Sequence, residues 1–224
     1  RNETVGILEL VKNSYDADAK LVQVRIVGTK RLETTQIVIL DDGCGMDKDT
    51  ILGRWFEPAT GEKEREKERK QRTSKFHRLP LGEKGVGRFA AHRLGRRLLL
   101  ISRPENSPTE MVVTVNWDDF DKAEKYLREV GVGWEERAPT YFKGEKHGTY
   151  LKMDHARSLW TEADVRALST SLQRLMSPLR APKDFRITLD CPDYRKYEDL
   201  DPGDLLNRSH AEFHGAVDQE GRLE

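Results

Sequence analysis

Cysteine is scarce in this chain, which has only Cys44 and Cys191 among its 224 residues. Two thiols are too few for a disulfide framework, and their positions do not form a metal-binding pair. Such cysteine usage is typical of reducing compartments, where disulfides are rare. We therefore expect a cytoplasmic protein that relies on neither a disulfide scaffold nor a cysteine metal site.

Long apolar runs and an excess of one charge sign are lacking as well. No stretch approaches the roughly 20 apolar residues that a membrane helix needs, and the opening RNETVGILEL lacks the basic segment and cleavage site of a signal peptide. Lys plus Arg and Asp plus Glu balance at 39 each. The overall charge therefore indicates neither a membrane nor a nucleic acid as partner, and the identity of any protein or DNA client is left open.

The composition is nevertheless that of a folded chain with a heavily solvated surface. Hydrophobic residues make up 36% and charged residues 35%, which suffices for one or two domains with a modest core. The most charged stretch, GEKEREKERKQRTSK at 61–75, is typical of a solvated helix or a disordered loop, although a mobile lid would have the same composition. An apolar helical pattern begins within five residues of the first one, so we expect part of a longer protein.

Hydrophobic periodicity predicts alternating helices and strands. Strands are expected at 21–27, 34–40, 96–102, 111–117, 147–154 and 184–190, the first two of them paired. Helices are expected at 3–19, 88–94 and 161–176, with Gly95 ending the second and Thr161 capping the third. Several consecutive strands have connections too short for parallel crossovers. The expected fold is therefore a two-layer α/β sandwich, with helices on one face of a mixed, mainly antiparallel sheet.

The C-terminal end of the chain has a pattern of its own. The final AEFHGAVDQEGRLE at 211–224 alternates in polarity and contains a turn-like DQEG, as at the first strand and turn of a further unit. We therefore expect residues 1–190 to form one domain, and residues 191–224 to form a connector and the start of a truncated second domain.

Three glycines, Gly82, Gly85 and Gly87, lie in the stretch LGEKGVGRFAAHRLG, ahead of a helical run of small residues. Their spacing excludes a P-loop, because Lys84 precedes the second glycine, and it excludes the dinucleotide fingerprint, whose glycines run in the opposite order. Glycine lets backbone N–H groups approach a ligand, and the following helix offers its positive end to an anion. By itself the motif fits a tight turn as well as a phosphate loop.

A polar stripe runs along the first predicted helix. Glu9, Asn13 and Asp16 project from one face, opposite the apolar side on which Ser14 is expected. Such a stripe is ordinarily the solvated face of a helix. An amide oxygen is also a suitable ligand for Mg²⁺, and a carboxylate one turn away could orient a water for attack on phosphorus.

The stretch DDGCG at 41–45 directly follows an apolar strand. Asp41 is therefore expected at a strand end inside the fold, where a carboxylate accepts hydrogen bonds from an exocyclic amine such as that of adenine. Gly43 and Gly45 would let a flat ligand approach the backbone. The alternative is an acidic turn with glycines at positive φ.

Together these motifs resemble the GHKL superfamily, the Bergerat-fold ATP-binding proteins that include gyrase, the ninety-kilodalton heat-shock chaperones, sensor histidine kinases and MutL. ELVKNSYDA at 9–17 resembles the N box of that family, Glu-x-x-x-Asn-x-x-Asp-Ala. DDGCGM at 41–46, GEKGVG at 82–87 and the Gly-Thr pair at 148–149 resemble its three later boxes, in the same order. The resemblance covers about residues 3–190.

The resemblance implies roles for individual residues. Glu9 would activate the attacking water, Asn13 would hold the Mg²⁺ that bridges the phosphates of ATP, and Asp16 would be a second polar support near the metal or the adenine. Asp41 would accept from the adenine amino group. The base would lie against Gly43, Gly45 and Met46, with Thr149 completing the adenine site.

The same resemblance assigns the glycine-rich stretch to the phosphates. Gly82, Gly85, Val86 and Gly87 would form the phosphate-facing loop, and residues 50–84 the lid. Lys84 would meet a phosphate, although a solvated lysine explains the residue equally well.

The function implied is Mg²⁺-dependent ATP hydrolysis, with lid closure and nucleotide-dependent dimerisation driving movement of attached domains. Glu9 together with Asp16-Ala17 matches the hydrolysing branch, most similar to its chaperone and MORC-like members, rather than the Asn-Ala-x-Lys of sensor histidine kinases. Two alternatives stay open. One is a nucleotide-gated interaction module that does not hydrolyse ATP, and the other is a histidine-kinase catalytic domain with a phosphoacceptor domain upstream.

Overall fold

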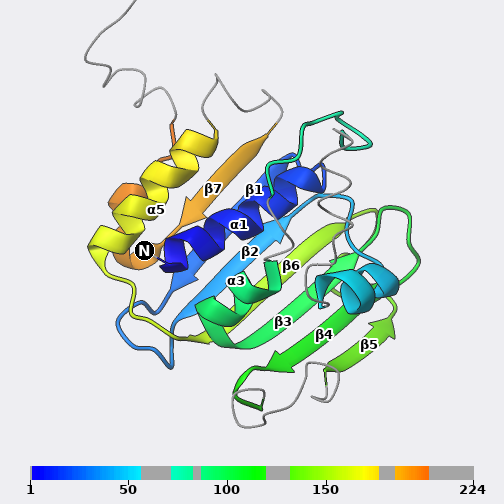
Figure 1. Cartoon of the computed structure of the whole chain (residues 1–224), viewed down its shortest axis with the longest axis horizontal. Coiled ribbons are helices and arrows are strands. Elements are labelled where there is room, and N and C mark those ends of the chain that lie inside the picture. The colour runs from blue at the N-terminus through cyan, green and yellow to red at the C-terminus, as the bar shows by residue number, and fades with distance from the viewer. Residues whose placement is uncertain (1, 57–71, 83–86, 120–131, 177–184, 202–224) are drawn as a thin grey trace, which may run out of the picture.

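A computed structural model describes residues 2–56, 72–82, 87–119, 132–176 and 185–201 (Figure 1). The first half of the described chain contains α1 (Asn2–Asp16), β1 (Leu21–Val27), β2 (Gln36–Asp41), the π-helix η1 (Thr50–Trp55) and α3 (Gly87–Leu94). The second half contains β3 (Gly95–Arg103), β4 (Glu110–Asn116), β5 (Gly133–Arg137), β6 (Gly148–Ala156), α5 (Glu162–Leu175), β7 (Arg186–Asp190) and the 3₁₀ helix η3 (Pro192–Tyr197). Helices α1, α3 and α5 cover one face of the sheet (Figure 1).

The strands of the described chain form one mixed sheet in the order β5-β4-β3-β6-β2-β1-β7. The pair β1 and β7 is parallel, and every other neighbouring pair in this order is antiparallel. This confirms the predicted α/β sandwich and the pairing of the first two strands. The register places Asp41, the last residue of β2, directly opposite Thr149 near the start of β6. Two motifs that are far apart in the sequence therefore meet where these two neighbouring strands end and begin.

The core lies between the sheet and the helices. Period-2 burial along β1 and β2 turns Val22, Val24, Ile37 and Ile39 toward the helical layer. The apolar side of α1 packs onto them through Ile7, Leu10 and Val11, each no more than 1% exposed. Burial of such side chains removes apolar area from water, at roughly 25 cal/mol per Å², and fixes which face of α1 remains available for other contacts.

The predicted N-cap of the last long helix is confirmed. Thr161 lies just before α5, where its hydroxyl accepts a hydrogen bond from the backbone N–H of Asp164, and the Asp164 carboxylate accepts one from the backbone N–H of Thr161 at 3.0 Å. This reciprocal arrangement satisfies backbone donors that a helix start leaves unpaired.

The second predicted helix ends where expected, because α3 ends at Leu94, directly before Gly95. Gly95 is not a left-handed cap, however: its φ is not positive, and it begins β3, where a Cβ would lie 2.8 Å from the Asp154 carbonyl oxygen of the neighbouring strand. Strand β5 was not predicted, because its five residues are mostly exposed and show no alternation of buried and exposed positions. An edge strand that contacts one neighbour needs no apolar face, so its sequence carries little signal.

Several sequence expectations lie outside the described residues, among them most of the charged run and the expected strand and turn at 211–224. Within the described chain, η3 follows β7 and contacts the same core: the Asp193 carboxylate accepts two hydrogen bonds from Thr29, and Leu200 is buried. The domain boundary at 190 stays a prediction. None of the described helices combines the length and apolar character that would let it cross a membrane.

The loop that leads into β6 is organised by a buried carboxylate. Glu110, at the start of β4, is fully buried and accepts hydrogen bonds from the backbone N–H groups of Thr140, Tyr141 and Phe142 and from Arg137 Nε at 3.0 Å. Burial raises the pKa of this carboxyl, but the hydrogen bonds outweigh burial and hold the pKa below its ordinary value. Glu110 therefore fixes this loop as an anion.

Glu110→Gln is expected to lower the free energy of unfolding at neutral pH by about 1–3 kcal/mol, because charge-assisted bonds are lost and one amide oxygen must serve several donors. Denaturant titration at several pH values would measure it. Since the folded pKa lies below the unfolded one, the difference from the parent should shrink as pH falls through the acidic range. Glu135→Gln, at an exposed position of β5, is the matched control; an equal loss in both variants would contradict the role of Glu110.

Candidate functional site

The solvated face of α1 carries the first group of predicted residues. Glu9 and Asn13 lie one turn apart on this helix, away from the apolar side chains that contact the sheet. The Glu9 Oε1 atom accepts a hydrogen bond from Lys12 Nζ at 2.6 Å, and the Glu9 side chain is 16% exposed. The carboxylate is thus oriented by a neighbouring cation yet remains accessible to a small ligand such as water.

The first glycine of the glycine motif lies directly against this helix. The Asp16 carboxylate accepts hydrogen bonds from the backbone N–H groups of Leu81 at 2.7 Å and Gly82 at 2.9 Å. A Cβ on Gly82 would lie 2.6 Å from Asp16 Oδ2 and 3.4 Å from Asn13 Oδ1. The hydrogen bonds from Leu81 and Gly82 to the Asp16 carboxylate therefore bring the N box and the glycine motif together.

Asp41 occupies the buried end of β2, on the side of the sheet that faces α1. Its carboxylate accepts hydrogen bonds from Ser14 Oγ at 2.7 Å, from the Gly43 N–H at 3.0 Å and from the Thr149 N–H at 3.1 Å. Burial raises the pKa of Asp41 above its usual value, and these hydrogen bonds only partly oppose that rise. The result is a buried acceptor held in one orientation by three donors.

The turn after Asp41 needs its glycines for backbone packing. Gly45 has a φ of +69°, and a Cβ there would lie 2.1 Å from the carbonyl oxygen of Arg103. Gly43 does not have a positive φ, but its Cβ would lie 2.8 Å from the carbonyl oxygen of Ala17. These glycines therefore let the turn approach α1 and β3 closely, which is a requirement of the fold itself.

A buried serine links this turn to β6. Ser102 Oγ, in β3, accepts a hydrogen bond from the Met46 N–H at 2.8 Å, donates one to the Gly148 carbonyl at 3.0 Å and contacts Thr149 Oγ1 at 3.1 Å. Met46, Gly45 and Thr149 are thus brought beside Asp41, as expected for one site.

Sequence reasoning missed the roles of Ser14 and Ser102. Each carried a signal, because each is a polar residue at a position that the local pattern assigns to the apolar side of its element. A buried hydroxyl requires a hydrogen-bond partner, and here the partners are the other site residues.

The glycine motif is described only at its two ends. Gly82 contacts Asp16 as above, and Gly87 begins α3. Lys84, Gly85 and Val86 lie outside the described residues, so their expected contact with phosphates stays a prediction.

The described residues suit a magnesium ion held mainly by its substrate. They contain no group of three or more His, Cys, Asp or Glu side chains that could hold a metal. Mg²⁺ in phosphate-binding sites keeps several waters and takes one or two protein oxygens. The Asn13 amide oxygen, beside Gly82, is an oxygen ligand of that kind.

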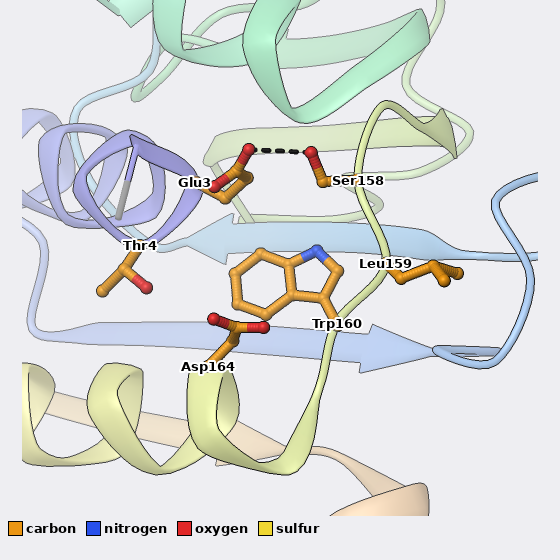
Figure 2. Close-up of a pocket in the computed structure, with 6 residues that line it drawn as sticks. All are labelled: Glu3, Thr4, Ser158, Leu159, Trp160 and Asp164. Atoms are coloured by element: carbon orange, nitrogen blue, oxygen red, sulfur yellow. Dashed lines mark hydrogen bonds between the residues drawn. The ribbon is translucent and has the colours of Figure 1, made fainter.

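One cavity formed by the described residues reaches the site at Asp41. It has a volume of about 300 Å³, and Leu40 and His147 line it together with Asp41. Another of about 220 Å³ lies at the N-terminal end of α1, where Glu3 accepts a hydrogen bond from Ser158 (Figure 2). Glu3 precedes Glu9 by six residues, roughly 9 Å along the helix. Neither cavity includes Glu9, Asn13 or Gly82.

Asp41→Asn is expected to raise the free energy of unfolding at neutral pH, because it removes a buried charge and can keep the same geometry. The Asn oxygen would accept from Gly43 and Thr149, and the amide would donate to Ser14, whose hydroxyl can turn toward the Leu10 carbonyl, 3.3 Å away. Thermal and denaturant unfolding would measure the change.

The difference in stability between Asp41→Asn and the parent is expected to depend on pH. Because burial makes the folded pKa of Asp41 higher than the unfolded one, the parent should lose stability relative to Asp41→Asn as pH rises above the ordinary range of aspartic acid, until the folded pKa is passed. Asp119→Asn, at an exposed position, is the control. A gap that widens toward acid pH would contradict the assignment of Asp41 as a buried, desolvated carboxylate.

Comparison with known families agrees with this geometry. A family model described as "Histidine kinase-, DNA gyrase B-, and HSP90-like ATPase" matches residues 2–149, from α1 to the start of β6. The match includes the N box, the turn after β2, the glycine motif and the Gly-Thr pair, and it supports ATP as the ligand of the site. A search of curated proteins found no match. With a family model spanning residues 2–149 of 224, the chain belongs to the family of histidine kinase-, DNA gyrase B- and HSP90-like ATPases.

Proposed function

We propose that the chain is a Mg²⁺-dependent ATP-hydrolysing module, with ATP bound between the polar face of α1, the end of β2 and the glycine motif. One observation carries this proposal. Two consecutive residues of α1 contact both halves of the site: Ser14 holds Asp41, and Asn13 lies against Gly82. A single rigid helix thereby sets the separation between an adenine-binding carboxylate and a phosphate-binding loop.

At the adenine end, Asp41 accepts from the exocyclic amino group of the base. Its burial and its three donors fix the acceptor before the ligand arrives, so binding costs little reorganisation. An asparagine at position 41 would direct its own N–H₂ group at the adenine amino group, so two hydrogen-bond donors would face each other. Asp41→Asn therefore serves as a binding-deficient variant whose fold is retained.

At the phosphate end, Asn13 would hold Mg²⁺ through its amide oxygen, and the ion, when bound, would supply positive charge that stabilises the transferred group. Glu9 lies four residues earlier on α1, a rise of about 6 Å. From there its carboxylate orients the attacking water and accepts its proton. Gly82, with Lys84, Gly85, Val86 and Gly87 of the same motif, binds the phosphates, and Thr149 and Met46 complete the adenine pocket.

We propose that ATP binding closes a lid within residues 50–84 and promotes dimerisation, and that hydrolysis reverses both. Such a cycle converts nucleotide state into movement of attached domains.

One observation favours a second candidate function. The Glu9 carboxylate is paired with Lys12 Nζ at 2.6 Å. If the pair persists with ATP bound, the Lys12 ammonium occupies the carboxylate oxygen that would orient the attacking water, and the chain acts as a nucleotide-gated interaction module. Phosphate release in a single turnover distinguishes the two functions.

Glu9→Gln is expected to lower the rate of ATP hydrolysis by about 100-fold or more, because the general base is removed, while affinity for a non-hydrolysable ATP analogue stays unchanged. Phosphate release under single-turnover conditions and calorimetric titration would measure both. Asp41→Asn should instead abolish binding of the analogue. Parent-like hydrolysis by Glu9→Gln would refute its role, and a parent that releases no phosphate above background would support the binding module.

Nucleotide-dependent dimerisation is tested by the molecular mass of the full-length protein in solution. We expect a monomer without nucleotide and a dimer with the non-hydrolysable analogue, because ligand contacts favour the closed state. The same mass under both conditions would contradict the proposed cycle.

A further inference from the structure

A short segment, residues 72–82, crosses the C-terminal end of α1 and leads into the glycine motif. We call it the tether. We propose that Arg78 is a positioning residue of the nucleotide site: it anchors the tether on α1 and so holds Gly82 against Asn13. This inference rests on the proposed function, since it concerns the phosphate end of that site.

Arg78 is anchored by backbone oxygens at the end of α1. Its side chain is buried, with the residue 3% exposed, and Nη1 donates to the carbonyls of Ala19 at 2.7 Å and Tyr15 at 3.2 Å. Tyr15 lies in the last turn of α1, where carbonyls lack partners within the helix and carry partial negative charge, and Ala19 lies just beyond the helix, so a guanidinium is favourable there. Arg78 is thus joined directly to the end of the helix that carries Glu9 and Asn13.

Aromatic rings enclose the same guanidinium. The Arg78 Cζ atom lies 4.7 Å from the ring centres of Tyr15 and Phe76 and 5.4 Å from that of Phe185. Tyr15 and Phe185 themselves meet edge to face at 5.0 Å. Cation–π contacts that are shielded from water are stronger than exposed ones, and a planar guanidinium satisfies rings and carbonyls together in a way that an ammonium does not.

Two carboxylates hold the two ends of the tether: Asp16 is the last residue of α1, and Asp18 follows it by two residues. Asp18 accepts hydrogen bonds from the Thr73 hydroxyl and from the backbone N–H groups of Lys75 at 2.8 Å and Phe76 at 3.3 Å. Asp16 accepts from Leu81 and Gly82, as described above. Arg78 lies between these two attachments, and its own backbone N–H and carbonyl both pair with Thr73.

The position of Arg78 is transmitted to Gly82 through a short, stiff connection. Three residues separate Arg78 from Gly82, and one of them is Pro80, whose φ is fixed. Gly82 is itself held by the hydrogen bond from its backbone N–H to the Asp16 carboxylate at 2.9 Å. A displacement of the tether therefore becomes a displacement of Gly82, and misplacement by about 1 Å at a reacting site can cost as much as 100-fold in rate.

The adenine end is held by other contacts. Asp41 is fixed by Ser14, Gly43 and Thr149, none of which lies in the tether. Loosening the tether should thus weaken the part of the affinity that the phosphates contribute and leave the adenosine part unchanged. A general loss of stability would lower both parts together, so the ratio of the two affinities separates positioning from folding.

The test compares Arg78→Lys and Asp18→Asn with Leu79→Ala, a control at a residue of the tether that is 52% exposed. Dissociation constants for adenosine and for Mg-ATP are measured by calorimetry, kcat by phosphate release, and amide exchange of residues 81 and 82 by hydrogen–deuterium exchange without nucleotide. Both test variants should keep the affinity for adenosine, lose affinity for Mg-ATP by about tenfold or more, lower kcat, and exchange the Leu81 and Gly82 amides faster. Leu79→Ala should match the parent in both dissociation constants, in kcat and in amide exchange.

Two results would overturn the inference. The first is unchanged exchange at Leu81 and Gly82 in the variants, whether or not any nucleotide binds. The second is an equal loss for adenosine and Mg-ATP, which would make Arg78 a stabiliser of the fold. If Arg78→Lys does not fold, Asp18→Asn decides. A parent that binds neither ligand would instead refute the proposed function. Amide exchange at Leu81 and Gly82 would still test whether Arg78 anchors the tether.

Discussion

The hydrogen bond from Ser14 Oγ to Asp41, 2.7 Å long, joins helix α1 to the end of strand β2, and the geometry of the site depends on it. Ser14 lies on the side of α1 that packs against the sheet, the same side as the buried apolar residues Leu10 and Val11. The same packing that buries those side chains turns the opposite face of the helix, with Glu9 and Asn13, toward the glycine motif. The orientation of α1 is therefore set by the core, and the site follows from that orientation.

Two buried carboxylates show how similar groups acquire different roles. Glu110 is surrounded by enough N–H donors that its pKa falls below the ordinary value despite burial, so its charge stabilises the loop that it binds. Asp41 has fewer donors, and burial dominates its pKa. Its charge is therefore a cost to the fold, which supports the proposal that Asp41 accepts from a ligand.

The attachments along α1 divide the proposed nucleotide site into two separately supported halves. Ser14 and the turn after β2 support the proposed adenine end, and Asp16, Asp18 and Arg78 support the proposed phosphate end through the tether. Because the halves share one helix but few contacts, their contributions to affinity can change independently. In the proposed ATP cycle, such an arrangement would let the lid respond to the phosphates while the base stays bound.

Much of this was readable in the sequence, because the signals are local. The period of the apolar residues predicted most of the strands and helices, and Thr161 marked the start of α5. The polar residues on α1 and after β2 indicated the chemistry of the site. By contrast, β5 has an exposed face and no pattern, and Gly95 serves strand packing rather than a left-handed helix cap. The partners of Ser14, Ser102 and Arg78 depend on which elements lie side by side, and only the tertiary structure decided them, since a buried polar group takes its partner from whatever the packed core places within hydrogen-bonding distance.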